Sequence, residues 1–228
     1  MNFENFILPH IWNLKPYSSA RDEFKGKEGI FLDANENPLG SGVSENWNRY
    51  PDPLQLGIKE QLAAIKSCST NQIFLGNGSD EAIDLLMRMT CQSGVNNIIL
   101  CPPTYGMYEV SAGINDVEVR KVNLTPDFQL DLEKIAETID TNTKMIFICS
   151  PNNPTGNSFS EESVVTLLER FKGIVVLDEA YIDFSNEPSF IQELHKFPQL
   201  IVLQTLSKAY GLASLRLGMA FANPTIIN

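Results

Sequence analysis

Polar residues follow three apolar runs of this sequence, and their types are those that catalysis uses. The apolar runs span 146–149, 174–177 and 200–203. Buried strands of this kind in an open parallel sheet present their carboxyl ends to one crevice. We therefore expect the polar residues that follow them to converge: Asn153, Asp178, Tyr181, Thr205, Ser207 and Lys208.

Lys208 is the candidate nucleophile. Most lysines are solvated surface charges, and that interpretation remains open. At the end of a buried strand, however, with hydroxyl neighbours and an aspartate nearby, desolvation and the cation Arg216 would favour a neutral, nucleophilic amine. Tyr105 also has two possible interpretations. Its ring could pack in the core, or it could provide a flat surface for another aromatic ring.

Residues 76–81, Gly-Asn-Gly-Ser-Asp-Glu, follow a predicted strand and open a predicted helix. The free amides and the dipole of such a helix start could bind a phosphate. A tight turn with Ser79 as the N-cap is an equally good interpretation. A dinucleotide-binding fingerprint would need glycine at position 81, where this sequence has Glu81. Asp178 and Glu179 could resemble the acidic pair of an ATPase, but the sequence contains no G-x-x-x-x-G-K-[ST] loop to bind the nucleotide.

The remaining pattern predicts the elements that position these residues. Helices are expected over 54–66, 80–91, 105–112, 131–139 and 160–171, and strands over 73–75, 97–101, 117–122, 144–149, 173–177 and 200–204. This alternation is typical of βαβ units and a mainly parallel sheet.

Composition restricts the class of protein. The 228 residues are 43% hydrophobic and 20% charged, with a net charge of −11, which disfavours nucleic acid as a partner. No apolar run reaches the length of a membrane helix, and the N-terminus lacks the pattern of a secretory signal, so we expect a cytoplasmic protein.

The four cysteines are predicted to be small buried hydrophobes, and His10 and His195 form no ligand motif, so no metal is expected.

Three motifs together resemble those of a known family. Segments 150–156 and 178–181, and Ser207-Lys208 followed by Arg216, are similar to the cofactor motifs of fold-type I pyridoxal-phosphate aminotransferases. Segments 16–21, 33–38, 49–52, 101–108 and 205–209 extend the resemblance over nearly the whole chain and narrow it to the histidinol-phosphate aminotransferase family. The resemblance implies an α/β fold, a three-layer αβα sandwich around a mainly parallel sheet.

The resemblance also implies a role for each motif residue, with pyridoxal 5'-phosphate as the cofactor. Lys208 would bind the cofactor covalently and move a proton between substrate and cofactor. Asp178 would keep the pyridine nitrogen protonated. Asn153 and Tyr181 would hydrogen-bond the phenolic oxygen, and Tyr105 would stack on the ring. The cofactor phosphate would be surrounded by Ser79, Asp80, Thr205, Ser207 and Arg216.

Other implied roles concern the substrate and a second subunit. Tyr17 and Asn35 would contact the substrate, and Tyr50 would reach the cofactor phosphate of the neighbouring subunit in a homodimer. The implied reaction moves an amino group from glutamate to imidazole acetol phosphate, giving histidinol phosphate in histidine biosynthesis. An aromatic aminotransferase, a phosphothreonine decarboxylase and a cofactor-binding fragment without turnover remain alternatives.

The length predicts a fragment when it is compared with the family. We expect an N-terminal arm over 1–45 and a large cofactor-binding domain over 46–228, with the small C-terminal domain and its substrate-binding arginine missing. The apolar residues of the arm would then be exposed, and cofactor binding and turnover would be weaker than in a longer chain. These residues are Phe3, Phe6, Ile7, Leu8, Ile11, Trp12 and Leu14.

Overall fold

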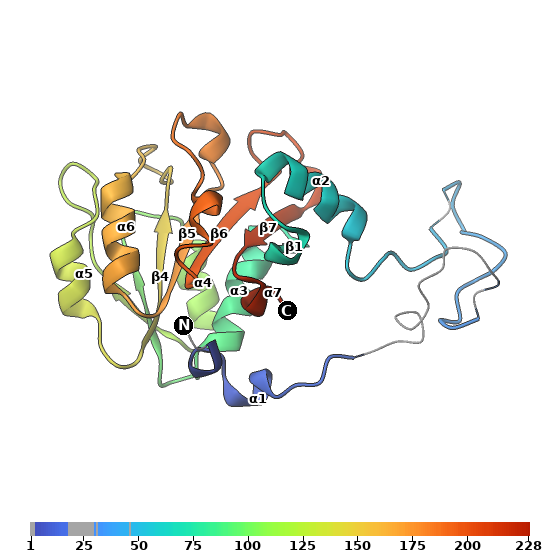
Figure 1. Cartoon of the computed structure of the whole chain (residues 1–228), viewed down its shortest axis with the longest axis horizontal. Helices are drawn as coiled ribbons and strands as arrows, with labels where there is room; N and C mark the ends of the chain where they lie inside the picture. The colour runs from blue at the N-terminus through green and yellow to red at the C-terminus, as the bar shows by residue number, and fades with distance from the viewer. Residues whose placement is uncertain (1–2, 18–29, 31, 46) are drawn as a thin grey trace.

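A mixed, mostly parallel sheet forms the centre of the protein (Figure 1). The computed structural model describes residues 3–17, 30, 32–45 and 47–228. The strand order is β1-β7-β6-β5-β4-β2-β3, and β7 runs antiparallel to both β1 and β6. The strands are β1 (Ile73–Asn77), β2 (Asn97–Leu100), β3 (Glu118–Lys121), β4 (Thr143–Cys149), β5 (Ile174–Asp178), β6 (Leu200–Thr205) and β7 (Leu217–Phe221).

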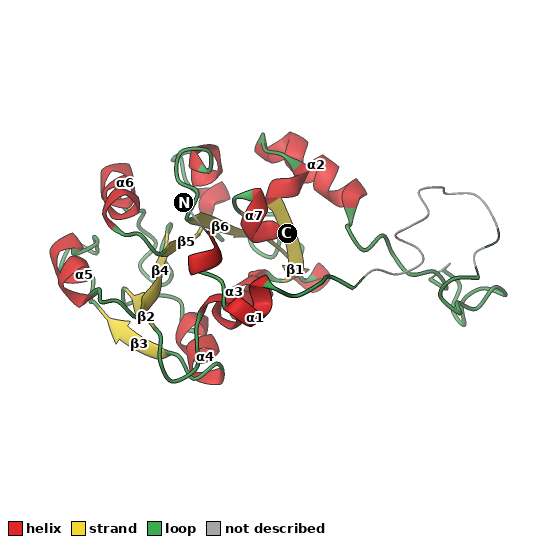
Figure 2. Ribbon diagram, turned by 60° about the horizontal axis from the view of Figure 1, so that its bottom comes forward, coloured by secondary structure: helices red, strands yellow, loops and turns green. Residues whose placement is uncertain are grey.

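Helices cover both faces of the sheet, which confirms the predicted three-layer αβα fold. Figure 2 shows α5 and α6 on one side and α3 and α4 on the other. The helices are α1 (Pro9–Trp12), α2 (Leu56–Lys66), α3 (Ser79–Thr90), α4 (Met107–Ile114), α5 (Leu132–Thr138), α6 (Glu161–Arg170) and α7 (Pro224–Ile227), and the short 3₁₀ turns are η1 (Phe3–Asn5), η2 (Thr70–Gln72), η3 (Ile182–Phe184), η4 (Phe190–Glu193) and η5 (Ala213–Leu215). Within the described residues, none of these helices combines the length and the apolar character that a membrane crossing requires.

The apolar runs of the central strands supply two separate cores. Along β5, Val175 and Leu177 pack into the core beneath α5 and α6, whereas Ile174 and Val176 pack into the core beneath α3 and α4. All four side chains are almost completely buried. Consecutive strand residues point to opposite faces, so a strand that is covered on both sides needs an unbroken apolar run.

The predicted helices and strands are all present, with ends that differ by one or two residues. The sequence analysis did not predict β7, a short strand that contains glycine and pairs antiparallel with its neighbours. The helix expected from residue 105 begins at Met107, after the turn that carries Tyr105. Of the cysteines, Cys91, Cys101 and Cys149 are buried as predicted, and Cys68 is only half-buried.

The first described residues are packed against α3 and the core beneath it, which corrects the expectation that they are exposed. Phe3 and Ile7 are buried, and Phe6 packs against the core beneath α3 and α4. The Leu8 amide donates to the Met89 carbonyl at 2.8 Å, which ties this segment to the end of α3. The exposure expected for Leu14 is found, because 64% of that residue is accessible to solvent.

Gly218 lets three backbone segments approach one another closely. It lies on β7 between Gly76 of β1 and Thr205 of β6. A Cβ atom at this position would lie 2.1 Å from the backbone nitrogen of Ser79. Only glycine therefore allows β7 to pass directly beneath the turn from β1 to α3.

We expect Gly218→Ala to destabilise the chain by about 3 kcal/mol, because the methyl group would meet backbone atoms that cannot move aside. The matched control is Gly113→Ala in α4, where an added Cβ meets nothing within 4 Å. That change should stabilise the chain by about 0.4–1 kcal/mol. Chemical denaturation of both variants measures the difference, and equal stability of the two would contradict the proposed close approach.

Candidate active site

A cleft with a volume of about 110 Å³ opens at the carboxyl ends of the central strands. It is lined by Gly78, Ser79, Asp80, Tyr105, Cys149, Asn153, Asp178, Ala180, Tyr181, Thr205, Ser207, Lys208 and Arg216. The six residues expected to converge at this edge are all in its lining. Asp178 and Thr205 end β5 and β6, and the turns after β4, β5 and β6 carry the other four there.

Asp178 is the buried anion of this cleft. Its Oδ2 accepts a 2.7 Å hydrogen bond from the Tyr108 hydroxyl, and its Oδ1 accepts from the Ala180 amide at 3.0 Å. Burial raises the pKa of Asp178, and these two donors oppose that rise. Both donors are neutral, so they orient the carboxylate without cancelling its charge. A cation that enters the cleft would therefore find a fixed counter-ion.

The sequence analysis missed Tyr108 as a site residue. Tyr108 is completely buried and stacks on Phe147, with 5.0 Å between the ring centroids. Desolvation and the neighbouring charge of Asp178 raise the pKa of this phenol well above its usual value, so it remains a donor. An aromatic residue at the start of a helix is usually core, and the partner that gives this one a second role lies 70 positions away in the sequence.

The part of the cleft around Arg216 is suited to an anion. Arg216 reaches the Ser207 hydroxyl at 3.4 Å and the Ala213 carbonyl at 3.2 Å. Gly78 has a φ of 77°, and a Cβ there would lie 2.6 Å from Nη2 of Arg216, so glycine makes the room for the guanidinium. Gly78, not Ser79, is the N-cap of α3, and no side chain caps the helix. Ser79 as an N-cap is therefore wrong, because its position is already helical and its amide belongs to the open first turn.

Lys208 lies in the turn that follows β6. Its Nζ is 5.5 Å from the centre of the Tyr181 ring. In the same turn, Thr205 donates from its hydroxyl to Ser207 Oγ at 3.0 Å, and the Ser207 amide donates back to Thr205 Oγ1 at 3.1 Å. Lys208 is exposed, so burial does not desolvate it as the sequence analysis expected. The reason is its place beyond the end of the strand, where the Tyr181 ring lies beside the amine.

Tyr105 forms a wall of the cleft. Its hydroxyl donates to Asp80 Oδ1 at 3.2 Å, and its ring meets Tyr108 edge to face with centroids 5.5 Å apart. Partial burial and the charge of Asp80 raise the pKa of Tyr105 to about 12. The ring is therefore held in place by one polar and one aromatic contact, and it remains partly open to the cleft.

Asn153 and Tyr181 join this cleft to a neighbouring cavity that continues over residues 184–187. Glu179, in contrast, is absent from the lining of the cleft and lines a cavity beside Leu177 on the other face of the sheet. Asp178 and Glu179 thus do not act as an acidic pair in one site, because consecutive residues at a strand end point in opposite directions.

Three sequence-predicted residues are not brought to the cleft in this chain. Tyr17 and Tyr50 are 90% and 72% exposed, and Asn35 is exposed with a φ of 52°. In Figure 1 the segment around residues 32–45 extends away from the sheet. Tyr17 and Asn35 therefore do not line the cleft of this chain, and their contacts with the substrate stay a prediction.

The family model for aminotransferase class I and II matches residues 27–228. The chain belongs to the class I and II aminotransferases. A histidinol-phosphate aminotransferase of Cytophaga hutchinsonii is 58% identical to this aminotransferase chain over 227 residues, which is 100% of the chain and 65% of that relative. The chain thus spans about two thirds, or slightly less, of the length of the curated relatives it matches.

Solved aminotransferases share the fold. Histidinol-phosphate aminotransferase from Sinorhizobium meliloti, solved in complex with pyridoxal-5'-phosphate, has 25% identity and a TM-score of 0.73, over 85% of this chain and 56% of that one. L-threonine-O-3-phosphate decarboxylase from Porphyromonas gingivalis has 25% identity and a TM-score of 0.66, over 78% of this chain and 53% of that one.

The residues of the cleft fit pyridoxal phosphate in charge and in shape. Arg216 and the open first turn of α3 offer donors to a phosphate, and Gly78 leaves the space that this end needs. Asp178 offers an anion to a protonated pyridine nitrogen. Lys208, in the same lining, offers the amine that an aldehyde requires.

We expect Tyr108→Phe to lower the stability of the chain by about 1–3 kcal/mol at pH 7, because Asp178 would lose a buried donor. Burial raises the pKa of Asp178, so the folded chain holds this proton more tightly than the unfolded chain, and protonation stabilises the fold as the pH falls through the raised value toward 3.8. The protonated carboxyl needs the phenol less, so the cost of the substitution should shrink in acid. Thermal unfolding between pH 4 and 8 measures it, with Tyr210→Phe at an exposed tyrosine as the control. A cost that does not vary with pH would contradict the role assigned to this bond.

Proposed function

We propose that this chain carries the pyridoxal-phosphate site of a histidinol-phosphate aminotransferase. The observation that carries the proposal is one cleft in which an amine, Lys208, shares the lining with a buried carboxylate, Asp178, and a cationic end at Arg216. Pyridoxal phosphate needs these three groups, for its aldehyde, its pyridine nitrogen and its phosphate. Bound there, the cofactor supplies an aldehyde that captures the substrate amine and a ring that accepts the electron pair of the breaking C–H bond.

In this proposal the residues of the cleft hold the cofactor in a fixed orientation. Arg216, Ser207 and the first amides of α3 bind the phosphate, with Thr205 holding the Ser207 hydroxyl and Asp80 next to that turn. The Tyr105 ring lies against one face of the cofactor. Asn153 and Tyr181 donate hydrogen bonds to the phenolic oxygen and so favour its anion.

Two residues of the chain handle protons. Asp178 holds a proton on the pyridine nitrogen, because its own charge is fixed by Tyr108 and by the Ala180 amide. With the cofactor bound, Lys208 Nζ would move a proton between the substrate carbon and the C4′ carbon of the cofactor. Its exposed position after β6 leaves the amine free to turn between these two tasks.

The substrate pair rests on the relatives. The identity of 58% with the histidinol-phosphate aminotransferase of Cytophaga hutchinsonii supports histidinol phosphate as one amino donor. Glutamate, as the other, is what the resemblance of the motifs implies. The identity of 25% with the threonine-phosphate decarboxylase gives weaker support to that alternative.

We further propose a cytoplasmic homodimer with shared sites, and a cofactor-binding domain over 46–228 with an arm over 1–45. The exposure of Tyr50 supports the dimer, because in this chain its ring contacts no part of the cleft. Glu36 organises the segment by accepting from Arg49 at 2.8 Å and from the Tyr50 amide at 2.7 Å. Tyr50 of one protomer would then reach the cofactor phosphate of its partner.

Replacing Lys208 by Ala should abolish covalent attachment of the cofactor while phosphate binding remains. The measurement is borohydride reduction followed by intact mass, with one cofactor per chain expected for the parent and none for Lys208→Ala. Lys172→Ala, a change at an exposed lysine on the surface, is the matched control and should behave as the parent. Attachment to another single lysine in Lys208→Ala would sink the assignment.

The substrate assignment is tested by offering one amino donor at a time. Histidinol phosphate should convert the cofactor of the chain about tenfold or more faster than phenylalanine, followed by the change in its visible absorption. Release of carbon dioxide from phosphothreonine would favour the decarboxylase alternative instead. Cofactor binding without conversion by any donor would indicate a binding fragment.

A further inference from the structure

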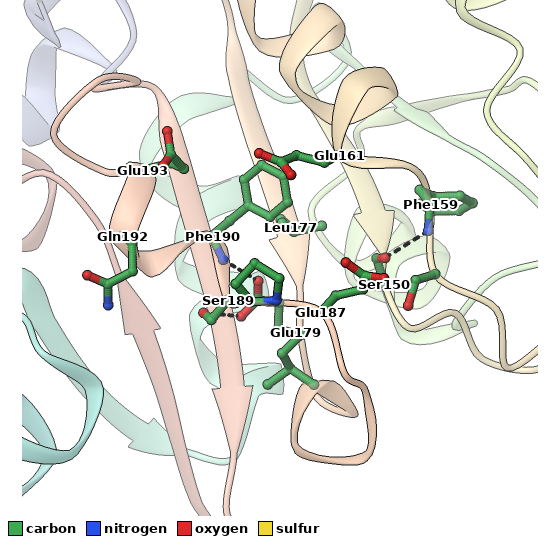
Figure 3. Close-up of a pocket in the computed structure, with 13 residues that line it drawn as sticks. Ser150, Phe159, Glu161, Leu177, Glu179, Glu187, Ser189, Phe190, Gln192 and Glu193 are labelled. Carbon is green, nitrogen blue, oxygen red and sulfur yellow. Dashed lines mark hydrogen bonds between the residues drawn. The ribbon is translucent and has the colours of Figure 1, made fainter.

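A buried carboxylate lies on the far face of the sheet, directly behind the cleft. Glu179 is 1% exposed and accepts three hydrogen bonds, from the Ser189 hydroxyl at 2.6 Å, the Phe190 amide at 2.8 Å and Gln204 Nε2 at 2.9 Å. Figure 3 shows Glu179 facing Ser189 and Phe190 in the cavity beside Leu177. Burial raises the pKa of Glu179, and the three donors oppose that rise. The mechanism proposed above gives this group no task.

The register of the sheet couples this carboxylate to the cleft. Asp178 of β5 pairs with Leu203 of β6. The residues that follow, Glu179 and Gln204, continue this register on the opposite face and are joined by their side chains. Glu179 follows Asp178 directly, and Gln204 precedes Thr205. The bond between Glu179 and Gln204 therefore joins the two strand ends behind the residues that face the cofactor.

The Glu179 carboxylate determines the orientation of the Gln204 side-chain amide. Gln204 is 2% exposed, its Nε2 points to Glu179 and Ser189, and its Oε1 is buried without a partner. An unpaired buried carbonyl is unfavourable. The Glu179 carboxylate can only accept hydrogen bonds. If the Gln204 amide were rotated, its Oε1 would face the carboxylate oxygen and two acceptors would meet, so the amide keeps its Nε2 toward Glu179.

The same carboxylate anchors the segment that follows the cleft. Tyr181 lines the cleft, and the chain then passes through η3 before returning at Ser189 and Phe190. The two bonds from Ser189 and Phe190 fix that return against β5. Both ends of the loop that carries Tyr181 are thus tied to one residue.

We propose that Glu179 is a positioning residue of the cofactor site, which holds Asp178, Thr205 and Tyr181 in binding geometry through its hydrogen bonds on the far face of the sheet. This inference rests on the proposed function only for the identity of the cofactor. We expect the positioning effect of Glu179 to depend on its hydrogen bonds and not on its charge. In Glu179→Gln, rotation of the Gln204 amide would let its Oε1 accept from the new side-chain amide, and the remaining oxygen would still accept from the Phe190 amide. The bond between the two strand ends and the bond to Phe190 would then persist, although Gln204 Nε2 would lose its acceptors.

The test compares Glu179→Ala with Glu179→Gln, and it uses Gln199→Ala as the matched control. Gln199 is also buried and hydrogen-bonded, to the Leu168 carbonyl at 2.7 Å, but it lies at the opposite end of β6. Glu179→Ala should weaken pyridoxal-phosphate binding by about tenfold or more per folded chain, and Glu179→Gln should stay within about threefold of the parent. Gln199→Ala should lower the unfolding temperature and leave the affinity unchanged.

A second readout needs no cofactor. Amide hydrogen exchange at residues 178–181 and 204–207 should be about tenfold faster in Glu179→Ala than in Gln199→Ala. Ser189→Ala, which removes one donor, gives the same comparison at smaller amplitude if Glu179→Ala does not fold. Unchanged exchange, or equal damage from Glu179→Gln and Glu179→Ala, would overturn the proposal. Faster exchange in a chain whose parent does not bind pyridoxal phosphate would support the positioning role and reject the proposed function.

Discussion

The burial of an anionic side chain at the end of β5 is the constraint on which the cleft depends. A carboxylate removed from water destabilises a fold unless donors or a cation compensate it. Around Asp178 the chain supplies one phenol and one backbone amide, which orient the group and leave its charge available. The chain therefore keeps at its centre a group that gains from a cationic ligand, and the aromatic stack of Tyr108 on Phe147 holds the donor in place.

The two faces of the sheet have different roles at the ends of β5 and β6. Asp178 and Thr205 face the cleft, while the residues beside them, Glu179 and Gln204, are joined on the opposite face. Strand alternation makes this division unavoidable, since neighbouring residues cannot point to the same side. A polar network behind a binding site can thus stabilise its geometry without touching the ligand, in the way that outer contacts orient the ligands of a metal.

The anionic and cationic ends of the cleft are built by different means. Side-chain chemistry supplies Asp178, whereas the part of the cleft around Arg216 depends on space between backbone segments. Gly78 and Gly218 allow the turn into α3, the Arg216 guanidinium and β7 to approach one another, and the uncapped helix start leaves its amides available. Two glycines therefore determine where an anion can be bound, although neither has a side chain to bind it.

The sequence alone determined the α/β class, most helix and strand positions and the residues that meet at the carboxyl edge. Periodicity and apolar runs are local properties, and polar residues after buried strands must lie at the strand ends. Only the tertiary structure decided the role of Tyr108, the opposite directions of Asp178 and Glu179, the exposure of Lys208 and the distance of Tyr17 and Asn35 from the cleft. Those depend on contacts between residues far apart in the chain, on strand register and on which segments find a core to pack against, and no local pattern encodes them.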